Sequence, residues 1–117
     1  MSVDRNYYVI GGYDLTGFKT DKYDYWQWTG QGEEYTHNQT KGKIQLFDDP
    51  MDGSYLYLGY IFASGDDYDF DTACFSISDI EKCQDEVEAE LLKLVDMGVI
   101  LKPALAEFRI IAFEELR

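Results

Sequence analysis

The chain has 117 residues, 23 acidic and 10 basic, so its net charge is −13 at neutral pH. A field of this sign repels nucleic acid, anionic membranes and phosphorylated ligands, and it speeds encounter with basic proteins. The length suits one domain spanning residues 1–117, and no apolar run approaches the roughly 18 residues needed to cross a bilayer. With two cysteines and no apolar leader, the sequence predicts a cytoplasmic protein without a disulfide framework.

The first predicted strand covers residues 6–10 and is followed by Gly11 and Gly12. A glycine pair after a strand also occurs in phosphate-binding loops, but the third glycine and the following helix are missing. The pair therefore predicts a bend or bulge that closes the strand.

Residues 21–29 are rich in Tyr and Trp, which favours a strand because aromatic side chains are enriched in sheets. In a strand, Trp26 and Trp28 share one face, where they either fill the core or form an exposed aromatic platform for a partner. The single histidine, His37, lies in the polar stretch that follows and predicts no metal or catalytic site.

Residues 42–62 carry the strongest strand pattern, with two apolar–polar alternating arms around a turn that contains Pro50, Gly53 and three aspartates. The residues that share the apolar face are Ile44 and Leu46 in the first arm, and Leu56, Leu58, Tyr60 and Phe62 in the second. Because the turn residues cannot continue a ladder, the pattern predicts an antiparallel hairpin.

The turn also raises an enzymatic alternative, in which Asp48, Asp49 and Asp52 hold a divalent metal or act as acid and base. A catalytic carboxylate pair needs surroundings that drive the two pKa values apart, and a turn this polar predicts solvated side chains instead. The prediction is therefore no enzyme, with no catalytic residue, metal or cofactor.

The acidic run that follows the hairpin contains Asp67, Asp69 and Asp71 at calcium-loop spacing, but Thr72 and Ser78 stand where that loop needs Gly and Glu. In a strand these three carboxylates lie on one face, roughly 6.6 Å apart, with Tyr68 and Phe70 on the other. That repeat is close to twice the 3.4 Å rise per phosphate of a DNA strand. The alternative is a solvated acidic edge strand that resists aggregation.

The main helix is predicted from about residue 79 to residue 97, with Ser78 and Glu81 as a capping box and Gly98 as its end. Its apolar stripe consists of Ile80, Cys83, Val87, Leu91, Leu94 and Val95. The acidic residues predicted on or beside the opposite, exposed face are Asp85, Glu86, Glu88 and Glu90.

The last predicted strand covers residues 108–113 and alternates so weakly that both of its faces are expected to be covered, as in the centre of a sheet. The complete pattern predicts an α+β fold, an antiparallel sheet of four to five strands with one main helix, from the C-terminal half, packed on one face. A small barrel is the alternative.

Residues 42–72, with the hairpin and the acidic run, resemble small accessory proteins of bacteriophages and prophages, which are compact α+β chains rich in Tyr and Asp. Such proteins often inhibit host machinery, including restriction and CRISPR nucleases, and several acidic ones mimic DNA. The resemblance implies a host-takeover or anti-defence protein acting in the host cytosol. The charge of this chain is spread, with 13 acids and 5 bases before Ser76 and 10 and 5 after, whereas mimicry needs a clustered face.

The leading functional hypothesis is a binding protein whose acidic, tyrosine-bearing face engages a basic surface of a nucleic-acid-handling protein, without contacting nucleic acid itself. The predicted partner contacts are Asp66, Asp67, Tyr68, Asp69 and Asp71, with Glu86 and Glu90 as a second patch. The alternatives are an immunity protein against a basic nuclease toxin and a structural or self-associating subunit. The last leaves a homodimer open, because the aromatic content could leave an apolar patch that needs cover.

Overall fold

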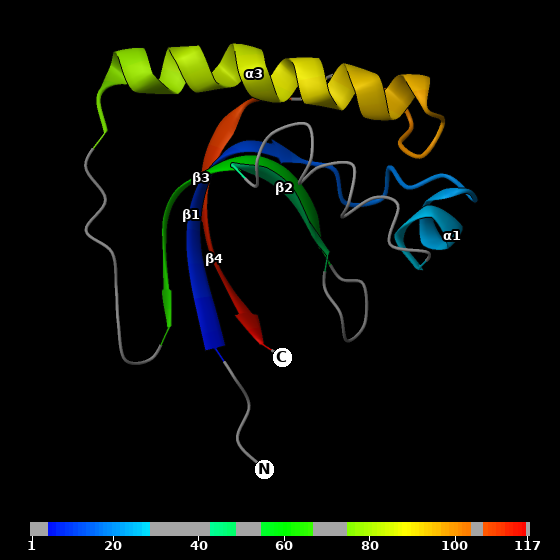
Figure 1. Ribbon diagram of the computed structural model, residues 1–117, viewed down its shortest axis with the longest axis horizontal. Helices are drawn as coiled ribbons and strands as arrows, with labels where there is room; N and C mark the ends of the chain where they lie inside the picture. Colours follow the sequence, from blue (N-terminus) through cyan, green and yellow to red (C-terminus); the bar gives the residue numbers. More distant parts are fainter. Residues whose placement is uncertain (1–4, 29–42, 49–54, 67–74, 104–106, 117) are drawn as a thin grey trace.

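The computed structural model describes residues 5–28, 43–48, 55–66, 75–103 and 107–116. Its elements in chain order are β1 (Arg5–Asp14), α1 (Tyr23–Trp28), β2 (Ile44–Asp48), β3 (Leu56–Asp66), α3 (Ile77–Asp96) and β4 (Arg109–Leu116). The four strands form one antiparallel sheet in the order β2-β3-β1-β4, and α3 lies across one face of it (Figure 1). The predicted α+β fold is therefore confirmed.

The predicted hairpin is present as β2 and β3, which pair antiparallel with Ile44 opposite Tyr60 and Leu46 opposite Leu58. Ile44 and Leu58 are buried in the core that faces α3, and Leu46 and Tyr60 pack against that core. The alternation read from the sequence therefore identified the correct buried face, while the connecting turn lies outside the described residues.

The first strand does not end at its glycines, which corrects the predicted bend or bulge there. β1 continues through both, with Gly11 opposite Tyr60 and Gly12 opposite Gly59, and its irregular step lies earlier, between Val9 and Ile10. The glycines are required by close packing, because a Cβ on Gly11 would lie 2.7 Å from a ring carbon of Phe62. A Cβ on Gly12 would lie 1.9 Å from the carbonyl oxygen of Leu58.

The sheet is strongly curled, so that aromatic rings from its two opposite edges meet on the face turned away from α3. The ring of Phe47 in β2 lies 5.2 Å from that of Phe113 in β4, and Tyr8 lies 4.8 Å from Phe47 and 5.5 Å from Phe113. Figure 1 shows this curvature as an arch beneath α3. The curl approaches the barrel alternative, but β2 and β4 remain separate edges of an open sheet.

The segment predicted as a second strand is instead the short helix α1. Tyr23 and Trp26, three residues apart, are both buried, whereas Asp24 and Tyr25 between them are exposed. This spacing is that of a helix, and it outweighs the β-preference of the aromatic residues. Trp26 belongs to the core, which confirms the first of its two predicted alternatives. The side chain of Trp28 lies outside the described residues.

The helix α3 begins two residues earlier than predicted, because Ser76 and Asp79 form the capping box in place of Ser78 and Glu81. It ends as predicted at Gly98, whose φ is +80°. The amides of Gly98 and Val99 donate to the carbonyls of Val95 and Leu94, the pattern of a Schellman cap.

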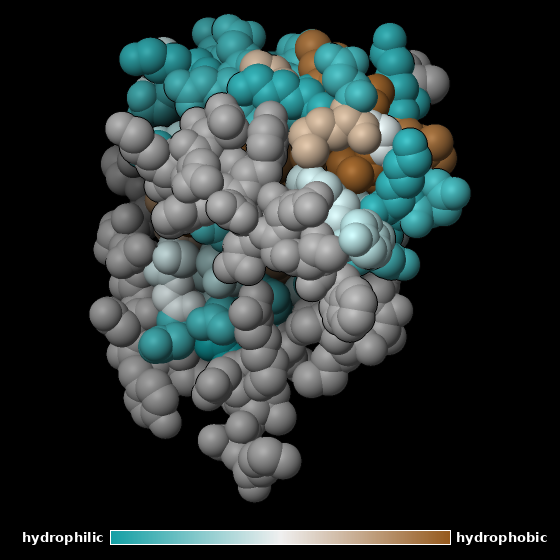
Figure 2. All heavy atoms as spheres, turned by 45° about the vertical axis from the view of Figure 1, so that its right-hand side comes forward, coloured by the Kyte–Doolittle hydropathy of each residue, from teal (hydrophilic) through white to brown (hydrophobic). Residues whose placement is uncertain are grey.

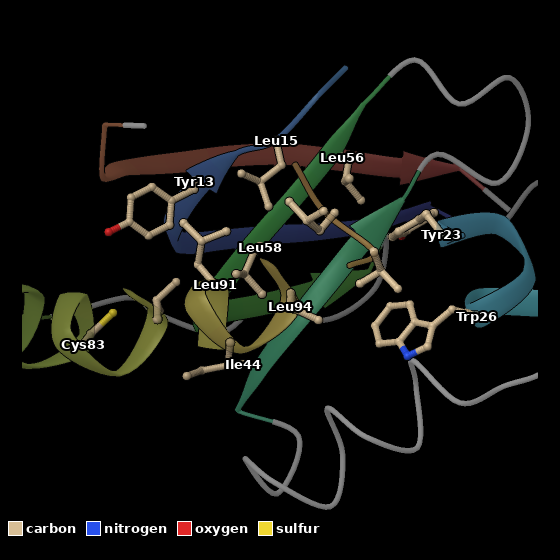
Figure 3. Packing of buried hydrophobic residues seen from close by; sticks show 13 residues of the cluster. Tyr13, Leu15, Tyr23, Trp26, Ile44, Leu56, Leu58, Cys83, Leu91 and Leu94 are labelled. Carbon is tan, nitrogen blue, oxygen red and sulfur yellow. The ribbon is translucent and has the colours of Figure 1, made fainter. Parts of the chain in front are cut away.

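The predicted apolar stripe of α3 packs against β1 and β3. Figure 3 shows Leu91 and Leu94 close to Leu58 of β3, with Cys83 on the same side of the helix. Because the stripe fills this interface, the opposite side of α3 is left to solvent.

The last strand, β4, is an edge strand and not the central strand that was predicted. Its weak alternation has another cause, the curl of the sheet. Phe113 is half-buried in the aromatic cluster beneath the sheet, while Ile110 and Ala112 on the side of α3 are exposed. Because α3 packs over β1 and β3, it leaves this flank of β4 uncovered.

Candidate partner-binding surface on α3

The negative charge of the described chain is concentrated on α3, which carries seven acidic and two basic side chains in 20 residues. The acidic residues exposed to solvent are Asp79, Glu81, Asp85, Glu86, Glu88 and Asp96. Figure 2 shows hydrophilic side chains gathered over the top of the molecule, where α3 lies. The acidic residues are spread evenly along the sequence, but among the described residues the helix gathers many of them on one element, as its predicted acidic face indicated.

Three of these carboxylates form what we call the α3 acidic stripe: Glu81, Asp85 and Glu88. Their spacing of four and then three residues places them on one side of the helix, opposite Cys83 and Leu94, which point into the core. At about 1.5 Å of rise per residue, successive members are about 4.5 to 6 Å apart along the axis. The stripe is thus a short row of like charges on a rigid element.

The two lysines of α3, Lys82 and Lys93, both lie about a quarter to a third of a turn around the helix from this stripe, because an α-helix turns roughly 100° per residue. Lys93 is engaged in an ion pair, its Nζ 3.1 Å from Oε1 of Glu90. Glu90 itself is only 8% exposed, next to the buried stripe. The sequence predicted Glu90 on or beside the exposed face and as a partner contact, and its burial corrects this prediction; Glu86 is exposed as expected.

The acidic stripe acts electrostatically on the tyrosine beneath it. The pKa of Tyr13 is raised by burial of its ring and, to a smaller extent, by the nearby charges of Glu88 and Asp85. Tyr13 is a core residue at 5% exposure, so it offers no contact surface to a partner.

The first turn of α3 extends the negative surface with a stabilised carboxylate. Hydrogen bonds from the backbone and the side chain of Ser76 lower the pKa of Asp79. The carboxylate therefore remains charged at any physiological pH. It also complements the positive end of the helix dipole.

Of the first predicted contact patch, the structure describes Asp66, which it places away from Glu86 and Glu90 of α3. Asp66 is exposed at the end of β3, opposite Asn6 near the start of β1. In Figure 1 this end of the sheet lies at the bottom, far from α3. The other predicted contacts of the acidic run, Asp67, Tyr68, Asp69 and Asp71, lie outside the described residues, so their role stays a prediction.

Of the three turn carboxylates in the enzymatic alternative, the structure describes Asp48, and its contacts do not favour catalysis. Both carboxylate oxygens of Asp48 accept hydrogen bonds from Lys19 Nζ, at 3.0 and 3.1 Å. The same ammonium lies 4.8 Å from the ring centre of Tyr23, so the contact ties the segment before α1 to the end of β2. An acid neutralised in this way has a structural role.

Other chemistry is sparse in the parts of the chain that the structure describes. Cys83 is buried, and burial followed by the charge of Glu86 raises its pKa to about 11, so the thiol is a poor nucleophile at neutral pH. Within the described ranges, no group of three His, Cys, Asp or Glu side chains is placed to hold a metal ion. None of the described helices is both long and apolar enough to span a membrane.

No protein-family model, no curated protein and no solved structure matches the chain. The α3 acidic stripe is the strongest candidate, and sequence reasoning chose Glu86 and Glu90 in its place. The signal that identifies the stripe is its four–three spacing opposite the apolar positions, which places Glu90 at the boundary of the buried face.

Proposed function

We propose that this protein is a small acidic binding protein that engages a basic surface of a nucleic-acid-handling protein, in the manner of bacteriophage-type inhibitors of host machinery. The observation that carries the proposal is the α3 acidic stripe, and Asp79 and Glu86 add exposed carboxylates elsewhere on the same helix. A helix held along its length by a packed core presents these charges at fixed spacing, which favours recognition over diffuse attraction.

The charge density supports a partial resemblance to nucleic acid. The stripe carries about one carboxylate per 5 Å of helix axis, compared with one phosphate per 3.4 Å in a DNA strand. A partner groove that accepts a phosphate backbone would therefore meet a similar, less dense row of charges. This spacing favours partial mimicry of DNA and weaker salt dependence than that of a duplex.

Long-range electrostatic attraction of a basic partner also supports the proposal. With a net charge of −13, the chain attracts basic surfaces over distances of about one Debye length, while the stripe fixes the final orientation. An immunity protein against a basic nuclease toxin would use the same surface, and the identity of the captured partner separates these two classes.

The test is capture from a bacterial lysate in low and high salt, with three immobilised baits: the unaltered chain and two triple variants. The two variants are E81Q/D85N/E88Q, which neutralises the stripe, and D21N/D24N/E107Q, which removes the same charge from exposed positions elsewhere. We expect a basic nucleic-acid-handling protein on the unaltered and control baits at low salt, its loss at high salt, and its absence from the stripe variant.

A short DNA duplex added to the lysate should compete for the captured protein, because both ligands would occupy the same basic groove. Recovery of no basic protein at low salt would contradict the proposal. Equal recovery on all three baits would show that α3 is not the contact surface.

A further inference from the structure

An exposed leucine continues the α3 acidic stripe toward the C-terminal end of the helix. Leu92 lies four residues after Glu88, so it falls on the same side of the helix as Glu81 and Asp85. It is 49% exposed, whereas Leu94, two residues further on, is buried in the core. A surface that matches the whole row therefore needs an apolar group as well as basic ones.

The spacing of this row is that of a seam between two helices. Its members follow one another at alternating intervals of four and three residues: Glu81, Asp85, Glu88, Leu92 and Val95. This alternation keeps two α-helices in contact along their length when they cross at roughly 20°. Val95 is half-buried and packs against the core, so the exposed seam runs from Glu81 to Leu92, about 16 Å at 1.5 Å per residue.

The charge of the seam determines what can lie on it. Like charges three and four residues apart repel each other and weaken a helix. None of the ion pairs found among the described residues involves a carboxylate of the stripe. Lysine or arginine side chains would relieve the repulsion, and their aliphatic stems would extend the apolar contact at Leu92. A second copy of α3 would instead set carboxylates against carboxylates, so the seam selects a basic helix.

We propose that the partner presents a basic amphipathic α-helix, which lies along the seam with its cationic side chains against the acidic stripe and an apolar side chain against Leu92. This inference rests on the proposed function and deepens it, because it names the element of the partner that α3 recognises. A helix that enters the major groove of DNA has the same basic character, so DNA would compete for it. Leu92 adds a contact that charge alone does not supply.

Synthetic peptides of about 20 residues test the proposal by fluorescence anisotropy with the whole chain at low salt. The first is an alanine-based helix with three lysines at alternating spacings of three and four residues and a leucine beyond each end, so that it fits in either direction. The second has the same composition with its lysines distributed around the helix. The third has alanine in place of both leucines. We expect the first to bind at least about tenfold more tightly than the second.

The substitution Leu92→Ala tests the apolar contact. It should weaken binding of the first peptide about fivefold, because about half of the side chain is left for a partner to bury, and it should not change binding of the third. Alanine favours the helix, so α3 is preserved. The matched control is Leu101→Ala, outside α3 and 52% exposed, which should have no effect.

Equal binding of the first two peptides, or equal effects of Leu92→Ala and Leu101→Ala, would overturn the helical partner. Capture from the lysate separates this failure from that of the proposed function. If the stripe variant still loses the captured protein, the stripe binds a basic surface of another shape and only the helix is refuted. If the stripe variant retains that protein, α3 is not the contact surface and both proposals fail.

Discussion

Replacement of Gly12 by Ala tests the curled sheet on which the fold depends. The new Cβ would lie 1.9 Å from the carbonyl oxygen of Leu58 and 2.6 Å from the Cα of Gly59, whereas real Cβ contacts do not fall below 3.0 Å. The nearest atoms belong to backbone, so β1 and β3 must separate by about 1 Å beyond their usual spacing of roughly 4.8 Å. This separation breaks ladder hydrogen bonds worth about 1 kcal/mol each and leaves buried polar groups unpaired. The Gly12→Ala variant should therefore lose about 3 to 5 kcal/mol of its free energy of unfolding.

This loss is a large share of the roughly 5 to 15 kcal/mol that stabilises a domain. Urea unfolding followed by circular dichroism measures it as a lower midpoint at unchanged slope. The matched control is Gly17→Ala, where φ is +86° and no atom lies within 4 Å of the new Cβ. That variant should lose only the left-handed backbone penalty of about 1 to 2 kcal/mol. Equal losses in the two variants would refute the close approach of β1 and β3.

Three further predictions concern α3. Ser76→Ala removes the capping side chain and should cost about 1 kcal/mol in urea unfolding. The pKa of Asp79 is lower in the folded than in the unfolded chain, so the charged carboxylate stabilises the fold at neutral pH. This stabilisation is lost as the pH falls through the folded-state pKa. An Asp79→Ala variant should therefore lose less stability on acidification than the unaltered chain, as measured by urea unfolding at a series of pH values. In a Cys74→Ser background, Cys83, with its pKa of about 11, should react with a thiol reagent at pH 8 only after unfolding; rapid reaction of the folded protein would contradict its burial.

Periodicity predicted the elements whose burial is regular. The β2–β3 hairpin and the stripe of α3 each bury one face, so their hydrophobic period is visible in the sequence. The start of α3 was misplaced because both Ser76 and Ser78 are followed three residues later by an acid. Ser76 is the cap in the structure, and its Oγ lies 2.9 Å from that of Ser78.

Prediction failed where tertiary packing overrides local preference. The six residues of α1 are too few for a clear period, and the relevant signal was the three-residue spacing of Tyr23 and Trp26. For β4, apolar residues on both faces suggested a central strand. The curl of the sheet explains them instead, because it brings Phe113 against Phe47 of the opposite edge, a contact that no local pattern encodes.

The candidate surface was only partly visible in the sequence. The charge of −13 and an acidic helix face could be read directly. The four–three spacing of Glu81, Asp85 and Glu88 could also be read, whereas the burial of Glu90 beside the apolar stripe depends on how far the packing of α3 extends the buried face. Glu90 is buried and ion-paired with Lys93, whereas Glu88 is exposed and can contact a partner.

The most direct measurement of the central claim is the affinity of the captured partner, measured by titration calorimetry over a series of salt concentrations. The stripe variant E81Q/D85N/E88Q should bind at least about tenfold more weakly than the unaltered chain, with a smaller slope of affinity against salt. The control D21N/D24N/E107Q should keep both the affinity and most of the slope. If the two variants lose affinity equally, binding depends on total charge, and α3 is not the surface that recognises the partner.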